Sequence, residues 1–161
     1  MLEHLGHQQL DELTYAARAS PRRRMHQNLH ASWRDANQRL MNAVEPESYI
    51  RPHRHSLDPK IESLIALRGR FGVLIFGGQG QITESVILGS GAAGDCSLVQ
   101  IRPDQWHTVV SLEPGSILFE AKAGPFDPVT AKEFAPWAPA EGDASAVEYL
   151  DRLRVGLGAI R

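Results

Sequence analysis

The 161-residue chain contains a single cysteine, Cys96, so no disulfide can form within it. A lone cysteine without a CxxC partner suits a reducing compartment and is typical of a small, half-buried side chain. Long apolar runs are also missing, and no segment reaches the length of a transmembrane helix. The first ten residues, MLEHLGHQQL, include a glutamate and lack the apolar centre of a signal peptide. We therefore expect a cytoplasmic protein that does not enter a membrane.

An excess of charge of either sign is missing too, because the formal net charge is -2. This balance gives no general attraction to nucleic acid or to an anionic membrane. The cluster Arg22-Arg23-Arg24 is short, and after Ser20-Pro21 it predicts a solvated turn, not a nucleic-acid patch. Hydrophobic residues make up 42% of the chain, which is enough for one core without a metal or disulfide to hold it.

Helical patterns occupy the two ends of the chain. Apolar residues at helical spacing predict a short helix from Gln8 to Ala19, which Ser20-Pro21 ends because the residue before proline avoids the helical region. Near the other end, Asp143 is a candidate N-cap and Gly156 a candidate terminator of a second helix. The predicted apolar stripe of this second helix consists of Ala146, Val147, Leu150 and Leu153.

Between the helices the pattern changes to short strands, beginning near Gln38. Many apolar runs separated by Gly, Pro and Asp turns indicate an antiparallel sandwich or barrel, not an alternating βαβ sheet. FGVLIFGGQGQI predicts a hairpin, because its glycines do not open a helix as a phosphate loop would. The proline-rich GPFDPVTAKEFAPWAPAEGD predicts an irregular, ordered wrap. We expect one compact domain with an N-terminal helix and arm (1–34), a barrel (35–140) and a C-terminal helix (141–161).

The stretch YIRPHRHSLDPKIE, residues 49–62, holds two of the seven histidines one residue apart. Residues i and i+2 of a strand point to the same face, so His53 and His55 project together. In a surface loop they would be two solvated imidazoles, whereas inside a barrel they would need a partner. Glu62 lies in the apolar run of the next predicted strand, and His107 begins a later one after the turn RPDQ. Three imidazoles and one carboxylate from three strands suit a divalent metal with open positions.

This spacing resembles the two-motif signature of the cupin superfamily. There the two histidines and the glutamate of the first motif hold a metal with the histidine of the second motif. The resemblance implies His53, His55, Glu62 and His107 as ligands, with Gly69 closing the first motif. Two features depart from the family pattern. SLDPKI is a longer spacer than usual between the second histidine and the glutamate, and RPDQWH has no glycine in its turn.

The segments SPRRRMHQNLH, YIRPHRH, WHTVVSLEPGSILFEAKAGPF and FAPWAPAEG resemble, as a set, the WbuC-type cupin metalloproteins. The resemblance runs from about residue 10 to residue 142. It implies an all-β cupin double-stranded β-helix (jelly roll) of the RmlC-like kind, with one divalent ion of iron, manganese, nickel or zinc. It also implies a homodimer. Because members of this group are often associated with surface-polysaccharide gene clusters, it favours a sugar or sugar-nucleotide substrate.

Three charged residues are candidates for catalysis. Glu120 and Lys122 share one face of a late strand and could line a pocket, or could form an ordinary surface pair. Arg51 lies on the same side as His53 by strand parity, and could anchor a carboxylate or stand at the rim. Three functions stay open: a metal-dependent small-molecule enzyme, a non-catalytic metal-dependent binder or sensor, and a metal-free epimerase. The epimerase needs a tyrosine acid, for which only Tyr49 is close to the expected barrel mouth.

Overall fold

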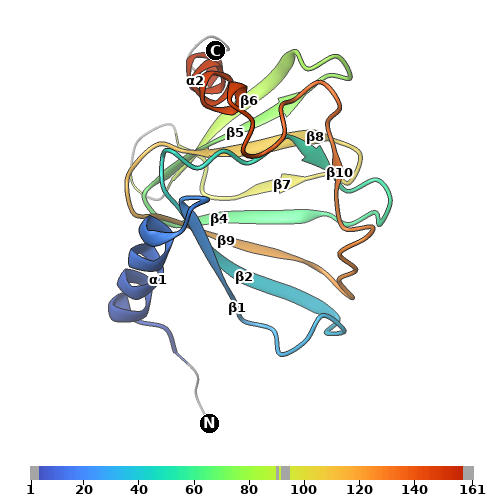
Figure 1. The fold of residues 1–161 in the computed structure, drawn as a ribbon. Coiled ribbons are helices and arrows are strands. Elements are labelled where there is room, and N and C mark those ends of the chain that lie inside the picture. Colours follow the sequence, from blue (N-terminus) through green and yellow to red (C-terminus); the bar gives the residue numbers. More distant parts are fainter. Residues whose placement is uncertain (1–3, 90, 92–94, 158–161) are drawn as a thin grey trace.

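The computed structural model of the chain describes residues 4–89, 91 and 95–157, and contains two facing antiparallel sheets with a helix near each end (Figure 1). The helices are α1 (His7–Ala19) and α2 (Ser145–Leu157). The strands are β1 (Arg24–Asn28), β2 (Asn37–Val44), β3 (His53–Arg54), β4 (Glu62–Arg68), β5 (Arg70–Phe76), β6 (Ile82–Gly89), β7 (Val99–Ile101), β8 (Trp106–Ser111), β9 (Ser116–Ala123) and β10 (Glu133–Phe134).

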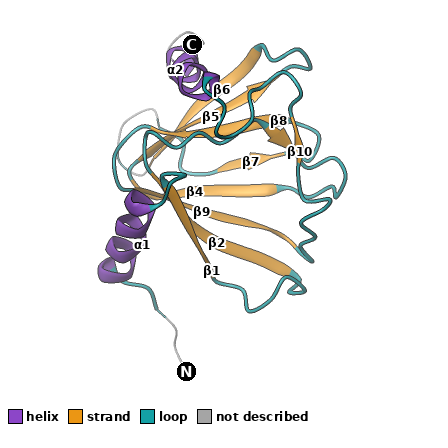
Figure 2. Cartoon of the chain, in the orientation of Figure 1, coloured by secondary structure: helices purple, strands orange, loops and turns teal. Residues whose placement is uncertain are grey.

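Each sheet has five strands, and the two form separate layers (Figure 2). The first sheet has the order β1-β2-β9-β4-β7, and the second has the order β10-β3-β8-β5-β6. From β2 to β5 the chain alternates between the sheets, which is the winding of a jelly roll. The prediction of an all-β double-stranded β-helix (jelly roll) with two short flanking helices is therefore confirmed.

A single residue, Gly69, joins β4 of the first sheet to β5 of the second. Its φ angle is 69°, in the left-handed region that glycine adopts without steric cost. An added Cβ would lie 2.1 Å from Oγ of Ser116, so the strand β9 passes directly over this corner. The glycine that closes the first cupin motif is thus the point where the chain changes sheet.

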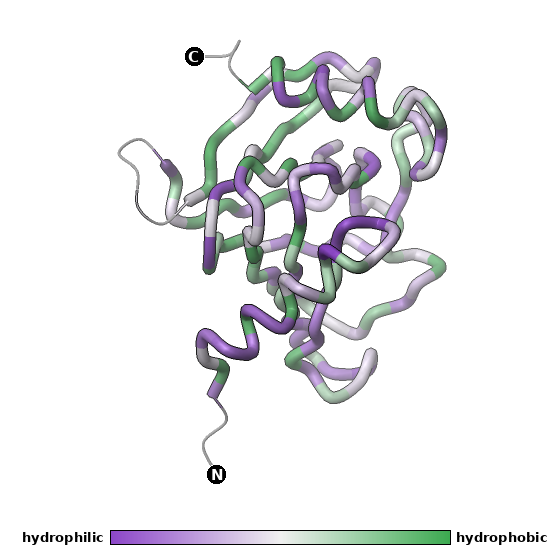
Figure 3. Tube along the Cα trace, turned by 60° about the vertical axis from the view of Figure 1, so that its left-hand side comes forward, coloured by the Kyte–Doolittle hydropathy of each residue, from purple (hydrophilic) through white to green (hydrophobic). Residues whose placement is uncertain are grey.

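Three hydrophobic clusters hold the layers together. One contains inward-facing residues of both sheets, such as Leu64, Val73 and Leu118, and fills the barrel. A second packs α1 onto the outer face of the first sheet. The third packs α2 and the C-terminal wrap onto the outer face of the second sheet. Hydrophobic and hydrophilic residues alternate around α2 in short groups (Figure 3), as expected of a helix with one buried side.

The expected helix from Gln8 to Ala19 is confirmed to within one residue, since α1 begins at His7. The details of the second helix differ from prediction. Gly156 lies within α2 and does not terminate it, because the helix runs on to Leu157. Val147 is 70% exposed and does not belong to the buried stripe of Ala146, Leu150 and Leu153.

Two polar segments contain strands that their composition concealed. Arg24 begins the edge strand β1 instead of lying in a solvated turn, and its guanidinium makes a two-oxygen ion pair with Glu141. The proline-rich wrap contains β10, which pairs with β3 through Glu133 opposite Arg54. Both strands form because their backbone groups pair with those of a neighbouring strand. An alternating apolar pattern in the sequence does not indicate such pairing.

Candidate metal site

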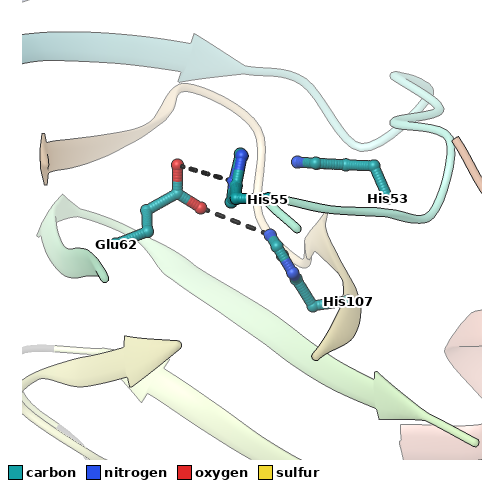
Figure 4. Close-up of side chains that lie close together, drawn as sticks. All are labelled: His53, His55, Glu62 and His107. Atoms are coloured by element: carbon teal, nitrogen blue, oxygen red, sulfur yellow. Dashed lines mark ion pairs between the residues drawn. The ribbon is translucent and has the colours of Figure 1, made fainter. Parts of the chain in front are cut away.

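Four buried side chains converge inside the barrel near one end (Figure 4). One potential ligand atom of each residue, His53, His55, Glu62 and His107, lies within 4.8 Å of the others. His53 on β3 stands opposite His107 on β8 in the second sheet, and Glu62 begins β4 in the facing sheet. The extra residues of the spacer SLDPKI form a turn, so the unusual spacing still brings Glu62 to the histidines.

A backbone carbonyl orients each imidazole ring. Nδ1 of His53 lies 3.0 Å from the Arg51 oxygen, and Nδ1 of His107 lies 2.9 Å from the Gln105 oxygen. Nδ1 of His55 lies 2.6 Å from the oxygen of Ala131 in the C-terminal wrap. A carbonyl oxygen only accepts hydrogen bonds, so each Nδ1 carries the proton and donates it. In the neutral rings, all three Nε2 atoms therefore keep a free lone pair.

The free nitrogens face the Glu62 carboxylate. Nε2 of His107 lies 3.3 Å from one carboxylate oxygen, and Nε2 of His55 lies 3.6 Å from the other. Both nitrogens are buried and have no hydrogen-bond partner. Lone pairs and a carboxylate that face one another in a dry interior need a cation between them, either protons or a metal ion. The donor set of three imidazole nitrogens and one carboxylate fits a divalent transition metal.

Burial and charge set the protonation of the cluster. Burial lowers the pKa of His53 well below 6.5, helped by the charge of Lys132 and opposed by Glu62. Burial by itself would raise the pKa of Glu62. In the metal-free protein, hydrogen bonds from His107 and His55, which need a proton on Nε2, and the charge of Lys122 outweigh burial and hold this pKa well below 4.5. The cluster thus favours neutral His53 beside an ionised carboxylate, which are the forms that bind metal.

In the metal-free protein, the contribution of His53 to stability is expected to decrease as the pH falls below 6.5. Below this value His53 of the unfolded chain takes up a proton while the buried ring stays neutral, so the contribution is about 1.4 kcal/mol per pH unit. The pKa of Glu120 is raised, so above pH 4.5 this residue makes the folded protein more stable as the pH falls. Urea unfolding at a series of pH values from 7 to 5 gives the slope of the unfolding free energy against pH. The slope of the wild type minus that of His53→Asn is the contribution of His53. Equal slopes would contradict this assignment.

Two of the three predicted catalytic candidates reach the cluster. Nζ of Lys122 lies 3.2 Å from a Glu62 oxygen and 2.7 Å from a Glu120 oxygen. Burial opposes the charge of Lys122, but the two carboxylates prevail and raise its pKa. Burial and the neighbouring Glu62 charge raise the pKa of Glu120. These residues are an internal charge network and not a surface pair.

Arg51, the third candidate, lies beside a neighbour of the cluster. Its guanidinium donates a hydrogen bond of 2.8 Å to the Ala135 oxygen and lies over the ring of Phe134, which also contacts His53. Because β3 begins at His53 and comprises only two residues, strand parity alone does not place the Arg51 side chain. A role of this side chain at the site stays a prediction, whereas its carbonyl oxygen orients His53.

Very little space remains beside the cluster. A cavity of about 10 Å³ lies next to His55, which is room for about one water molecule. Lys60 closes it by donating a hydrogen bond to the Pro125 oxygen. The lining residues that sequence reasoning missed are Asp58, Lys60, Ala123, Phe126 and Ala131. They come from the spacer, the end of β9 and the wrap, where composition gives no sign of proximity to histidines.

The arrangement can be compared with known proteins. A family model matches residues 5–88, which is slightly more than half of the chain. The chain belongs to the family described as Domain of unknown function (DUF6016). The matched part of this DUF6016 domain includes His53, His55 and Glu62, whereas His107 lies beyond it. A comparison with curated proteins finds no match.

Solved structures show that the DUF6016 domain shares its fold with distant proteins. Protein SO0799 from Shewanella oneidensis is 13% identical with a TM-score of 0.54, over 68% of this chain and 72% of that protein. An oxalate oxidase in complex with the substrate analogue glycolate is 13% identical with a TM-score of 0.53, over 86% and 75%.

The capsular polysaccharide assembling protein CapF from Staphylococcus aureus is 16% identical with a TM-score of 0.53. The match covers 68% of this chain but only 28% of CapF. At such low sequence identities, these similarities support a shared fold and no shared function. Among the residues described for the DUF6016 domain, neither helix combines the length and apolar character needed to cross a membrane.

Proposed function

We propose that this DUF6016 domain is a metal-binding cupin whose ligands are His53, His55, Glu62 and His107. One observation carries the proposal: three imidazoles are fixed by backbone carbonyls so that unprotonated nitrogens face a buried carboxylate. A divalent metal held there would polarise a carbonyl or hydroxyl group or lower the pKa of bound water. Lys122 holds one Glu62 oxygen in place, and the buried surroundings keep bulk water away.

The finer part of the proposal is a metal-dependent small-molecule enzyme that acts on a sugar or sugar-nucleotide in bacterial surface-polysaccharide metabolism. Its support is the resemblance to WbuC-type cupins and the fold that the chain shares with CapF, a capsular polysaccharide assembling protein. The same resemblance supports a homodimer. Glu120 and Lys122 would meet the substrate next to the metal, since both contact the cluster or its carboxylate.

One observation favours a second candidate, a non-catalytic metal-binding module. The cavity next to His55 measures only about 10 Å³, and with so little room on that side four protein ligands could close the coordination shell. The metal-free epimerase has the least support. Tyr49, its candidate acid, lies in the cluster beneath α2 and donates its hydroxyl hydrogen to the Pro139 oxygen.

Metal content tests the proposal directly. We expect about one equivalent of iron, manganese, nickel or zinc per chain by inductively coupled plasma mass spectrometry of tag-free protein. His53→Ala and His107→Ala should each lose most of it, because the three remaining donors hold a divalent ion far less tightly than four. His26→Ala, which alters an exposed histidine on β1, should keep it. A wild type that stays metal-free after reconstitution with each ion would overturn the proposal.

Cobalt substitution separates the enzyme from the binder. If a coordination position is open, azide added to the cobalt(II) protein should change its visible absorption spectrum. If the four side chains close the shell, azide should leave the spectrum unchanged, and this result would favour the non-catalytic module.

A further inference from the structure

A second cavity lies on the opposite side of the second sheet from the histidine cluster. Its volume is about 310 Å³, against about 10 Å³ beside His55. It opens between α2, the turn from β5 to β6, and the C-terminal wrap, which lie together in Figure 1. The lining residues are Phe76, Gln79, Gly80, Ile82, Trp137, Tyr149, Arg152 and Leu153. A volume near 300 Å³ is the lower end of the range for small-molecule sites.

Aromatic rings form the walls of this outer cavity. The rings of Phe76 and Trp137 have centroids 5.1 Å apart. Gly80 lies flat against the indole, since its φ angle is 86° and an added Cβ would come within 2.8 Å of the ring. Trp106 contacts the same indole edge-to-face at 6.4 Å. The indole is therefore held in place, and the wall exists before any ligand arrives.

Hydrogen-bond donors without partners surround these walls. The guanidinium of Arg152 lies 5.2 Å from the Tyr149 ring centroid and forms no ion pair within the described part of the chain. Arg154 on the same helix, by contrast, is paired with Asp151. The indole Nε1 of Trp137 is buried and has no hydrogen-bond partner either. A buried N–H without an acceptor costs free energy, and a ligand that supplies an acceptor removes that cost.

We propose that the outer cavity binds a small planar aromatic acid. The ring of the ligand stacks on the aromatic wall of Trp137 and Tyr149, and its carboxylate pairs with Arg152. Aromatic surfaces favour a flat apolar ring, and the planar guanidinium matches a carboxylate in a two-point contact. The volume accommodates one or two fused rings. This site does not depend on the metal cluster, because the second sheet separates the two.

The test uses 2-naphthoate and its neutral analogue 2-naphthamide as probes of the full-length protein. The chain has three tryptophans, so a 15N-labelled sample gives three indole N–H signals, and Trp137→Phe identifies that of Trp137. We expect naphthoate to shift this signal in a saturable manner and to bind about tenfold more tightly than naphthamide, because a charge-assisted pair contributes about one order of magnitude.

Arg152→Gln should weaken naphthoate binding about tenfold and leave naphthamide binding unchanged. Arg34→Gln, which alters an exposed arginine remote from the cavity, should change neither affinity. Arg152 is exposed on the helix surface, so the variant should fold, and its circular dichroism melting curve checks this. The proposal is overturned if naphthoate causes no saturable shift, if naphthamide binds equally well, or if Arg152→Gln binds naphthoate like the wild type.

Discussion

Replacing Lys122 with methionine is expected to lower the free energy of unfolding by about 3–5 kcal/mol, because removal of one partner leaves buried charge uncompensated. Lys122 is only 9% exposed and lies between the carboxylates of Glu62 and Glu120. Without its ammonium group, the carboxylates of Glu62 and Glu120, which lie on the adjacent strands β4 and β9, would repel each other. The measurement is urea unfolding of metal-free wild type and variant at pH 7.

Two further variants and the pH dependence distinguish uncompensated charge from lost side-chain packing as the cause of the destabilisation. Arg34→Met, which alters an exposed arginine away from the network, should change the unfolding free energy by less than about 0.5 kcal/mol. Adding Glu120→Gln to Lys122→Met should recover part of the loss. The deficit should also shrink as the pH falls towards 4.5, where a carboxylate of the variant takes up a proton. A loss below about 1 kcal/mol for Lys122→Met would contradict the buried network.

Gly69→Ala is expected to cost about 2–4 kcal/mol of unfolding free energy. Part of the cost is the left-handed φ angle of 69°, which disfavours any residue with a Cβ. The remainder is overpacking, because the new methyl group would lie 2.1 Å from Oγ and 3.1 Å from Cα of Ser116. Thermal unfolding monitored by circular dichroism, with urea unfolding for the free energy, measures this loss.

Gly78→Ala is the matched control, since nothing lies within 4 Å of its Cβ position. It should change the unfolding free energy by less than about 1 kcal/mol. The double variant Gly69→Ala/Ser116→Ala should recover only part of the loss, because the backbone of β9 and the φ angle remain. Equal stabilities of Gly69→Ala and Gly78→Ala would refute the view of Gly69 as a constrained corner.

The sequence predicted the barrel because its signals are local. Apolar alternation and glycine or proline turns mark β4, β5, β6, β8 and β9, and each depends only on neighbouring residues. β1 and β10 were missed because they owe their strand geometry to backbone pairing with distant segments. Apolar alternation cannot report a partner that lies far away in the chain.

The candidate site was predictable in its side chains and not in its surroundings. Strand parity predicted that His53 and His55 lie in the same cluster, whereas it does not place Arg51, which precedes the short strand β3. The carbonyl groups of Gln105 and Ala131 orient two of the rings. Every residue has a backbone carbonyl, so the sequence does not show which of them contacts a histidine. Lys60 reaches the cavity through a turn that only the folded chain defines.

The three orienting acceptors are all main-chain oxygens, and this makes the cluster resistant to point mutation. Substitution at Arg51, Gln105 or Ala131 changes a side chain but leaves the oxygen that fixes the imidazole. Family members can therefore differ at these positions and still present the same nitrogens. Insertions or deletions directly beside Arg51, Gln105 or Ala131 would displace these oxygens, because they shift the backbone itself. The spacer SLDPKI is different, since its extra residues form a turn and leave Glu62 at the cluster.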